Sequence, residues 1–184
     1  MAEAGGVTTL GAGNTGFSWG TADNLYHLAR DVSGNFIAYS YTVGSGGTHD
    51  GWSRYGGVHV RDSTAAGAKS VSMTEIQSWA GSAFIYRLTT DDVSAAVTDG
   101  DRFDYNAVLR MGGIVEGYHS ADAATWTQIG TPQVMNGGLT DPVRVGPLLA
   151  GGSGFAHNVT IGWFWVRQYV RPEPTAALGL VEVP

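Results

Sequence analysis

The sequence predicts an all-β protein in which two antiparallel sheets form a β-sandwich. Short apolar segments rich in β-branched and aromatic residues recur along the 184 residues. Turn signals separate them at a spacing of roughly 8–12 residues, as in sandwiches and barrels. The 28 glycines lack a three-residue period, which excludes collagen and suits many tight turns. Hydrophobic residues make up 43% of the chain, enough for one sizeable core.

The clearest element is a hairpin over residues 114–130. Ser120 and Asp122 stand among small residues at its centre, which is the composition of a reversing chain. Tyr118 lies on one side of this turn, and Trp126 lies on the other, so both strands carry apolar surface. We therefore expect residues 114–119 and 126–130 to pair as neighbouring strands.

The other expected strands are short apolar segments bounded by turns. They cover residues 36–43, 58–61, 71–76, 84–88, 105–111, 143–149 and 159–170. Helical periodicity is weak, and only single helical turns are expected, at 22–30 and 91–97. Pro172 ends the last strand because proline cannot donate to a ladder.

The chain is expected to form one domain, in keeping with its length. Its parts are an N-terminal arm over 1–15, the sandwich over 16–171, and a proline-containing C-terminal tail or linker over 172–184.

The charge balance argues against several classes of partner. The formal net charge is −6, with a single lysine at position 69, so the surface offers little to a phosphate backbone or an anionic membrane. No segment is apolar for long enough to span a bilayer, and no signal-peptide pattern is visible. Cysteine is absent, which removes thiolate chemistry. We expect no nucleic-acid partner, no membrane insertion, and a location at an extracellular surface or in a virion.

Four segments resemble the concanavalin A-like lectin/glucanase superfamily. They are Gly57–Ser63, Tyr118–Gly130, Val143–Gly146 and Trp163–Thr175, the last of which is similar to the closing segment of prokaryotic surface-protein domains. The resemblance extends over 16–175 and implies a jelly roll of two curved sheets. The superfamily includes glycan-binding modules, adhesion domains, virion surface domains and glycosidases. The chain departs from its pattern at Ala123, where a turn glycine is usual, and at Gly162, where the closing strand often has aspartate.

Enzymatic activity is not expected. Glycoside hydrolysis needs two facing carboxylates, and the Glu-x-Asp-x-x-Glu strand of the related glucanases is missing. Glu75 and Glu116 each stand alone in an expected strand, where we expect solvated, outward side chains. No histidine pair has the spacing of a zinc site. A glycoside hydrolase remains the weakest of the alternatives.

One group of residues has the spacing of calcium ligands. Asp99, Asp101 and Asp104, with Asn106, place oxygen atoms on and after a turn, as hard cations prefer. The same residues also fit an ordinary hairpin turn followed by a strand. A structural calcium ion is therefore one of two interpretations, and no other cofactor is expected.

The closing strand carries the first candidate binding site. Trp163, Trp165, Arg167 and Tyr169 alternate and therefore share one face. If the intervening Phe164 and Val166 fill the core, this row lies outside as a binding platform or a subunit contact. The other possibility is that loops bury the two tryptophans.

The loop over 44–57 is the second candidate site. It is rich in glycine and contains residues that dominate interface energetics. These candidates are His49, Asp50, Trp52, Arg54 and Tyr55. Trp52 could instead cap the end of the sandwich, and Trp126 is expected in the scaffold of the core.

The sequence thus favours a non-enzymatic recognition or attachment module, with glycan as the first ligand class. The alternative is a virion structural or decoration protein that contacts capsid or tail proteins through its sandwich and terminal arms. Either function is compatible with a homo-oligomer, because exposed aromatic residues need partners.

Overall fold

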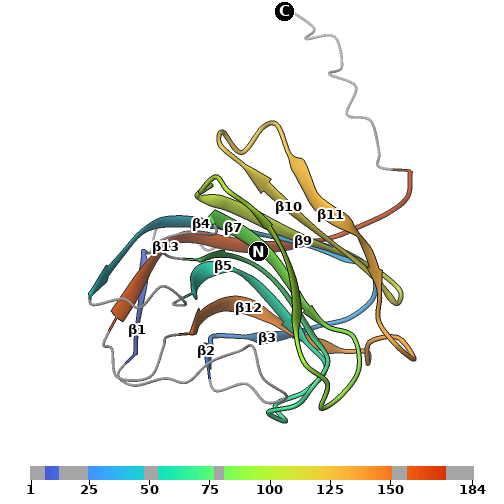
Figure 1. Ribbon diagram of the computed structural model, residues 1–184. Coiled ribbons are helices and arrows are strands. Elements are labelled where there is room, and N and C mark those ends of the chain that lie inside the picture. Colours follow the sequence, from blue (N-terminus) through green and yellow to red (C-terminus); the bar gives the residue numbers. More distant parts are fainter. Residues whose placement is uncertain (1–6, 13–24, 48–53, 77–80, 151–156, 173–184) are drawn as a thin grey trace, which may run out of the picture.

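The predicted fold is confirmed: two antiparallel sheets pack face to face (Figure 1). The computed structural model describes residues 7–12, 25–47, 54–76, 81–150 and 157–172, and every regular element in them is a strand. None of these residues belongs to a helix of the length and apolarity needed to cross a bilayer.

The six-stranded sheet joins strands from both ends of the chain. In spatial order it contains β1 (Thr8–Ala12), β13 (His157–Gln168), β4 (Phe36–Gly47), β9 (Tyr105–Met111), β10 (Ile114–Ser120) and β11 (Thr127–Val134). The expected hairpin is present, because Tyr118 pairs with Gln128 and His119 with Thr127.

The seven-stranded sheet forms the second layer. In spatial order it contains β2 (Tyr26–His27), β12 (Val143–Ala150), β5 (Arg54–Arg61), β6 (Ser70–Ile76), β7 (Gly81–Arg87) and β8 (Ala95–Asp99), while β3 (Arg30–Val32) also pairs with β12. The helical turns expected at 22–30 and 91–97 were wrong where the structure describes them. Short strands stand there instead, since Tyr26 and His27 pair with β12 and residues 95–99 pair with β7.

Strand alternation places one apolar set of side chains between the sheets. The core cluster takes residues from strands of both sheets and buries them almost completely. Its members include Phe36, Ala38, Val58, Val60, Val71, Met73, Phe84, Val108, Val115, Ile129, Val143 and Val145. This set fixes which face of each strand looks outward, and therefore where a binding surface can form.

β1 lies within the segment that the sequence assigned to an N-terminal arm. Its residues pair with the first half of β13, from Thr8 opposite Ile161 to Ala12 opposite His157. Leu10 packs against a small apolar cluster that includes Leu149. Residues 8–12 are therefore part of the sandwich.

Candidate functional site

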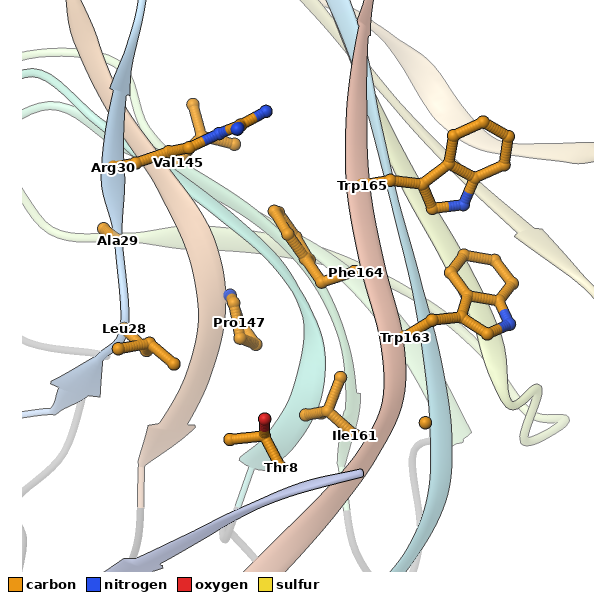
Figure 2. Close-up of a pocket in the computed structure, with 11 residues that line it drawn as sticks. Thr8, Leu28, Ala29, Arg30, Val145, Pro147, Ile161, Trp163, Phe164 and Trp165 are labelled. Atoms are coloured by element: carbon orange, nitrogen blue, oxygen red, sulfur yellow. The ribbon is translucent and has the colours of Figure 1, made fainter. Parts of the chain in front are cut away.

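The outer face of the six-stranded sheet carries most of the aromatic side chains that the structure describes there. We call this outer surface of the six-stranded sheet the aromatic face. Its rings are those of Tyr39 and Tyr41 on β4, Tyr105 on β9, Tyr118 on β10, Trp126 before β11, and Trp163 and Trp165 on β13. Trp165 is 48% exposed, and the others are partly exposed. Figure 2 shows Trp163 and Trp165 projecting from the side of β13 opposite to Phe164.

An extra residue in β13 sets this orientation. Ile161 lies opposite Thr42, but Trp163 lies opposite Tyr41, so Gly162 has no residue of its own across the ladder. Such a bulge shifts the alternation of the strand by one position.

The shift changes which positions of β13 point inward: odd-numbered residues do so before Gly162, and even-numbered residues do so after it. Val159 and Ile161 point into the sandwich before it, whereas Phe164 and Val166 pack on the core after it. Unbroken alternation would have put Ile161 and Trp163 on the same side. The bulge therefore lets β13 fill the core along its whole length and still expose Trp165.

Adding a methyl group at Gly162 is expected to disturb the aromatic face. A Cβ there would lie 2.6 Å from Cδ1 of Tyr41 and 2.8 Å from Cγ2 of Val43. We expect Gly162→Ala to lower the free energy of unfolding by about 1–2 kcal/mol, as for other overpacked sites, and to change the near-ultraviolet circular dichroism of the rings. Gly44→Ala, which meets nothing within 4 Å, is the matched control and should leave the spectrum unchanged.

Register across the sheet orders the aromatic face into rows. The first row runs Trp163, Tyr41, Tyr105, Ser120; the second runs Trp165, Tyr39, Ala107, Tyr118, Gln128; the third runs Arg167, Ile37, Leu109, Glu116. Rings dominate the first two rows, while the third is apolar in the middle and charged at both ends.

Ring contacts make the first two rows continuous. The ring of Tyr39 lies 5.3 Å from that of Trp165 and 5.2 Å from that of Trp126, both measured between centroids. Trp163 and Trp165 meet edge to face at 5.9 Å. These separations and angles are those that aromatic pairs prefer, so the rings support one another's orientation.

The other end of the ring array is a stacked tyrosine pair. Tyr41 and Tyr105 lie 4.7 Å apart with only 16° between their planes. Trp163 is 6.0 Å from each of them. Together with Tyr39, Trp126 and Trp165 they form a contiguous surface of six rings.

Two charged side chains border the rings. Arg167 donates to the hydroxyl of Tyr39 at 3.2 Å, and its guanidinium carbon lies 5.9 Å from the centre of that ring. Tyr118 donates its hydroxyl to the carboxylate of Glu116. Burial, together with the bond to Glu116, raises the pKa of Tyr118 far above its usual range. The phenol is therefore a hydrogen-bond donor at any ordinary pH.

The structure brings together the first predicted group of site residues. Trp163, Trp165 and Arg167 share the aromatic face as expected, with Phe164 and Val166 on the core side. Tyr169 follows the end of β13, where its N–H donates to the carbonyl of Asn35. The side chain of Tyr169 is partly exposed.

The structure describes only the backbone of two residues of the second predicted group, and these lie in the other sheet. His49, Asp50 and Trp52 lie outside the described residues. Arg54 and Tyr55 begin β5 and pair with Ala150 and Leu149 in the seven-stranded sheet. Their backbone thus belongs to the other layer of the sandwich.

Trp126 was expected in the scaffold of the core, and the structure corrects this. Its ring is partly exposed and packs on Tyr39, while its Nε1 donates to the carbonyl of Ala123 at 3.2 Å. The interior position of this hairpin is taken by Ile129. Tyr39, Tyr41 and Tyr105 were not predicted as site residues, although the alternate spacing of the first two within 36–43 was a usable signal.

Asp99, Asp101 and Asp104, one interpretation of which was a calcium site, lie on the segment between β8 and β9. The described residues contain no group of three metal-ligating His, Cys, Asp or Glu side chains. Asp99 lies 3.4 Å from His119, and the backbone carbonyls of Asp101 and Asp104 accept hydrogen bonds from Ser82 and Thr42. The segment therefore acts as a connection between the sheets.

Glu75 was expected to be solvated and is instead 1% exposed. Burial raises the pKa of its carboxyl group, an effect opposed by the ion pair with Arg102. Glu116 is the one carboxylate in the three rows named above, where it lies opposite Leu109.

A pocket of about 430 Å³ lies on the other side of β13. Figure 2 shows Leu28, Pro147, Phe164 and Ile161 around it, at the margin between the two sheets. The tryptophan rings point away from this space. Trp163 and Trp165 are nevertheless among the residues that line the pocket, so the pocket and the aromatic face meet along β13.

Comparison with known proteins supports the fold alone. No family model and no curated protein matches the chain. A crystal structure of a functionally unknown protein from Saccharomyces cerevisiae aligns over 90% of this chain and 89% of its own, with a TM-score of 0.70 and 16% identity. A variant of alginate lyase A1-II′ aligns over 91% of this chain and 82% of its own, with a TM-score of 0.52 and 11% identity. A family 7 alginate lyase in complex with substrate aligns over 90% of this chain and 79% of its own, with a TM-score of 0.52 and 10% identity.

Proposed function

We propose that this protein is a non-enzymatic glycan-binding module and that the aromatic face is its binding site. The observation that carries the proposal is the contiguous surface of six rings, with Trp165 at 48% exposure among them. Sugar rings present flat C–H surfaces that stack on indole and phenol rings, while their hydroxyl groups need polar partners at the rim. Arg167 and Glu116 provide such groups.

The similar structures agree with this ligand class. Alginate lyases, which stand among them, act on a polysaccharide. At 10–11% identity that likeness concerns the fold and assigns no reaction to this chain. We use it only to choose polysaccharides as the first ligands to test.

The chemistry of the aromatic face favours binding over catalysis. A hydrolase would need a second carboxylate across from Glu116. A reaction that removes a proton would need a base, and the raised pKa of Tyr118 keeps its phenol protonated. The described residues of this face therefore offer hydrogen bonds and stacking surface.

Binding to a glycan array, followed by calorimetry on the strongest ligand, tests the proposal. We expect Trp165→Ala to weaken binding about 30-fold, the effect of removing about 2 kcal/mol at a central aromatic contact. Because Trp165 is half exposed, the fold should persist. Val93→Ala, which shortens another exposed apolar side chain (63%) in the other layer, should bind like wild type. Equal affinity of wild type and Trp165→Ala would remove the proposal.

Assembly through the aromatic face is the second candidate function. The same sheet also exposes Val43 (52%) and Ile114 (38%), and a large exposed apolar surface is typical of subunit contacts. Analytical ultracentrifugation distinguishes the two functions. An oligomer that Trp165→Ala converts to monomer would favour assembly, whereas a wild-type monomer that binds sugar would exclude it.

A further inference from the structure

We propose that the pocket beside β13 binds a carboxylate that carries an aliphatic chain, as a medium-chain fatty acid does, with the carboxylate held by Arg30. This ligand is additional to the glycan proposed for the aromatic face and does not depend on it. Three observations carry the inference: a gap at one edge of the sandwich, the apolar walls of that gap, and a cation at its end.

The pocket lies where the strand at one edge of the sandwich stops. β1 pairs with β13 only from Ala12 to Thr8, which lies opposite Ile161. From Gly162 to Gln168 the structure describes no strand on that side of β13. The corresponding edge of the other sheet is formed by β2 and β3. The space between the two edges is about 430 Å³, within the range of small-molecule sites.

The seven-stranded sheet contributes one apolar wall. Leu28, Arg30 and Val32 share one side of the edge by alternation, and Val32 lies in the core. The backbone N–H of Leu28 donates to the carbonyl of Pro147 at 3.3 Å, which fixes Leu28 on β12. Its side chain lines the pocket and is 56% exposed. The edge therefore presents an uncovered leucine to the space between the sheets.

β13 contributes the opposite wall. Ile161 belongs to the small cluster with Leu149, and Phe164 packs against it. Figure 2 shows the ring of Phe164 on the side of β13 where Pro147 lies. At about 30 Å³ for each water-sized group, the pocket corresponds to roughly 14 such groups, enough for a fatty acid of about eight to ten carbons. Burial of an aliphatic chain between such walls is favourable.

Arg30 carries the only charge among the described residues that line the pocket. Figure 2 shows Arg30 at one end of the lining and Thr8 at the other. The side chain of Arg30 is exposed, and no group of the described chain bonds or ion-pairs with it. Asp31 points to the other side of β3, where it lies 3.9 Å from Arg144. The guanidinium is therefore available to a carboxylate, which it matches with two parallel N–H donors.

An inward-facing charge on an edge strand has a second possible role. Such a charge discourages pairing with a foreign strand, and that role needs neither a pocket nor a ligand. Binding is favoured here because Arg30 borders an apolar space that is large enough for the rest of an amphipathic anion. The two roles differ in what Arg30→Gln does: loss of ligand selectivity in one case, and self-association alone in the other.

Calorimetry with octanoate, octanol and acetate tests the inference. We expect wild type to bind octanoate most strongly, octanol more weakly, and acetate not at all in the same concentration range. Arg30→Gln should weaken octanoate binding about fivefold, as for the loss of an exposed ion pair, and leave octanol unchanged. The factor is modest because the net charge of −6 opposes anions at long range. Arg171→Gln removes an exposed arginine that is not part of the lining and is the matched control.

Two further variants locate the aliphatic chain. Leu28→Ala removes apolar contact from the pocket and should weaken octanoate and octanol alike, about threefold. Because Leu28 is exposed, the fold should persist, which urea unfolding of each variant checks. Trp126→Ala removes a ring of the aromatic face that does not line the pocket and should leave both affinities unchanged.

Several results would overturn the inference. They are no binding of octanoate by wild type at millimolar concentration, an equal or absent effect of Arg30→Gln on octanoate and octanol, and a loss in Trp126→Ala as large as in Leu28→Ala. None of these results bears on sugar binding by the aromatic face, which the glycan array tests separately.

Discussion

Replacing Gly57 by alanine is expected to lower the free energy of unfolding by more than about 3 kcal/mol. Gly57 has a φ of 66°, and a Cβ there would lie 1.9 Å from the carbonyl oxygen of Met73 in the neighbouring strand. Left-handed backbone costs an alanine about 1–2 kcal/mol, and the clash with β6 can be relieved only by opening the ladder. Urea unfolding followed by tryptophan fluorescence measures the effect.

Gly137→Ala provides the control for backbone strain. Gly137 has nearly the same φ of 68°, but an added Cβ would meet nothing within 4 Å. We expect a loss of about 1–2 kcal/mol there. Equal losses in the two variants would show that contact with Met73 does not determine the cost at Gly57.

Acid is expected to destabilise the protein by about 3 kcal/mol between pH 7 and pH 4 through His27 alone. Burial lowers the pKa of His27 from 6.5 to about 4, and the positive charges of Arg61 and Arg144 act in the same direction. The folded state therefore binds fewer protons than the unfolded state in this range. Stability is complete above pH 6.5 and falls as the pH drops toward 4.

His27→Gln isolates this contribution. Its side chain can still donate to the carbonyl of His59, which lies 3.2 Å from Nε2 of His27, but it does not titrate. The free energy of unfolding is measured by urea at each pH from 7 to 4. Its decline with falling pH should be less steep in the variant, by the slope that corresponds to the uptake of about one proton on unfolding. Parallel curves would contradict the assignment to His27, because other titrating groups contribute equally to both proteins.

The sequence was sufficient for the fold because apolar alternation and turn chemistry are local. The pairing of residues 117–119 with 127–129 follows from one turn, and the exposure of Trp165 follows from the placement of Phe164 and Val166 in the core. β1 was missed because Thr8 to Ala12 have little apolar character. They become a strand only when β13 offers an edge.

The aromatic face was only partly predictable, because it depends on register between distant strands. Tyr39, Tyr105 and Trp126 join Trp165 through contacts that no local pattern specifies. The same limit applies to Asp99, whose side chain lies near His119 of another strand. Spacing along the chain showed that the aspartates were close in sequence but gave no indication of where their side chains point.

The order of the strands also determines when the protein can fold during its synthesis. β12 lies between β5 and the pair β2 and β3, and β13 lies between β1 and β4, so each sheet stays divided until the last quarter of the chain has left the ribosome. Until then, the edges of β4 and β5 lack their neighbours, and such edges recruit foreign strands. Closure through pairs as distant as Phe36 and Gln168 proceeds in milliseconds to seconds. Expression at low temperature or with chaperones should therefore increase the soluble yield more than added stability does.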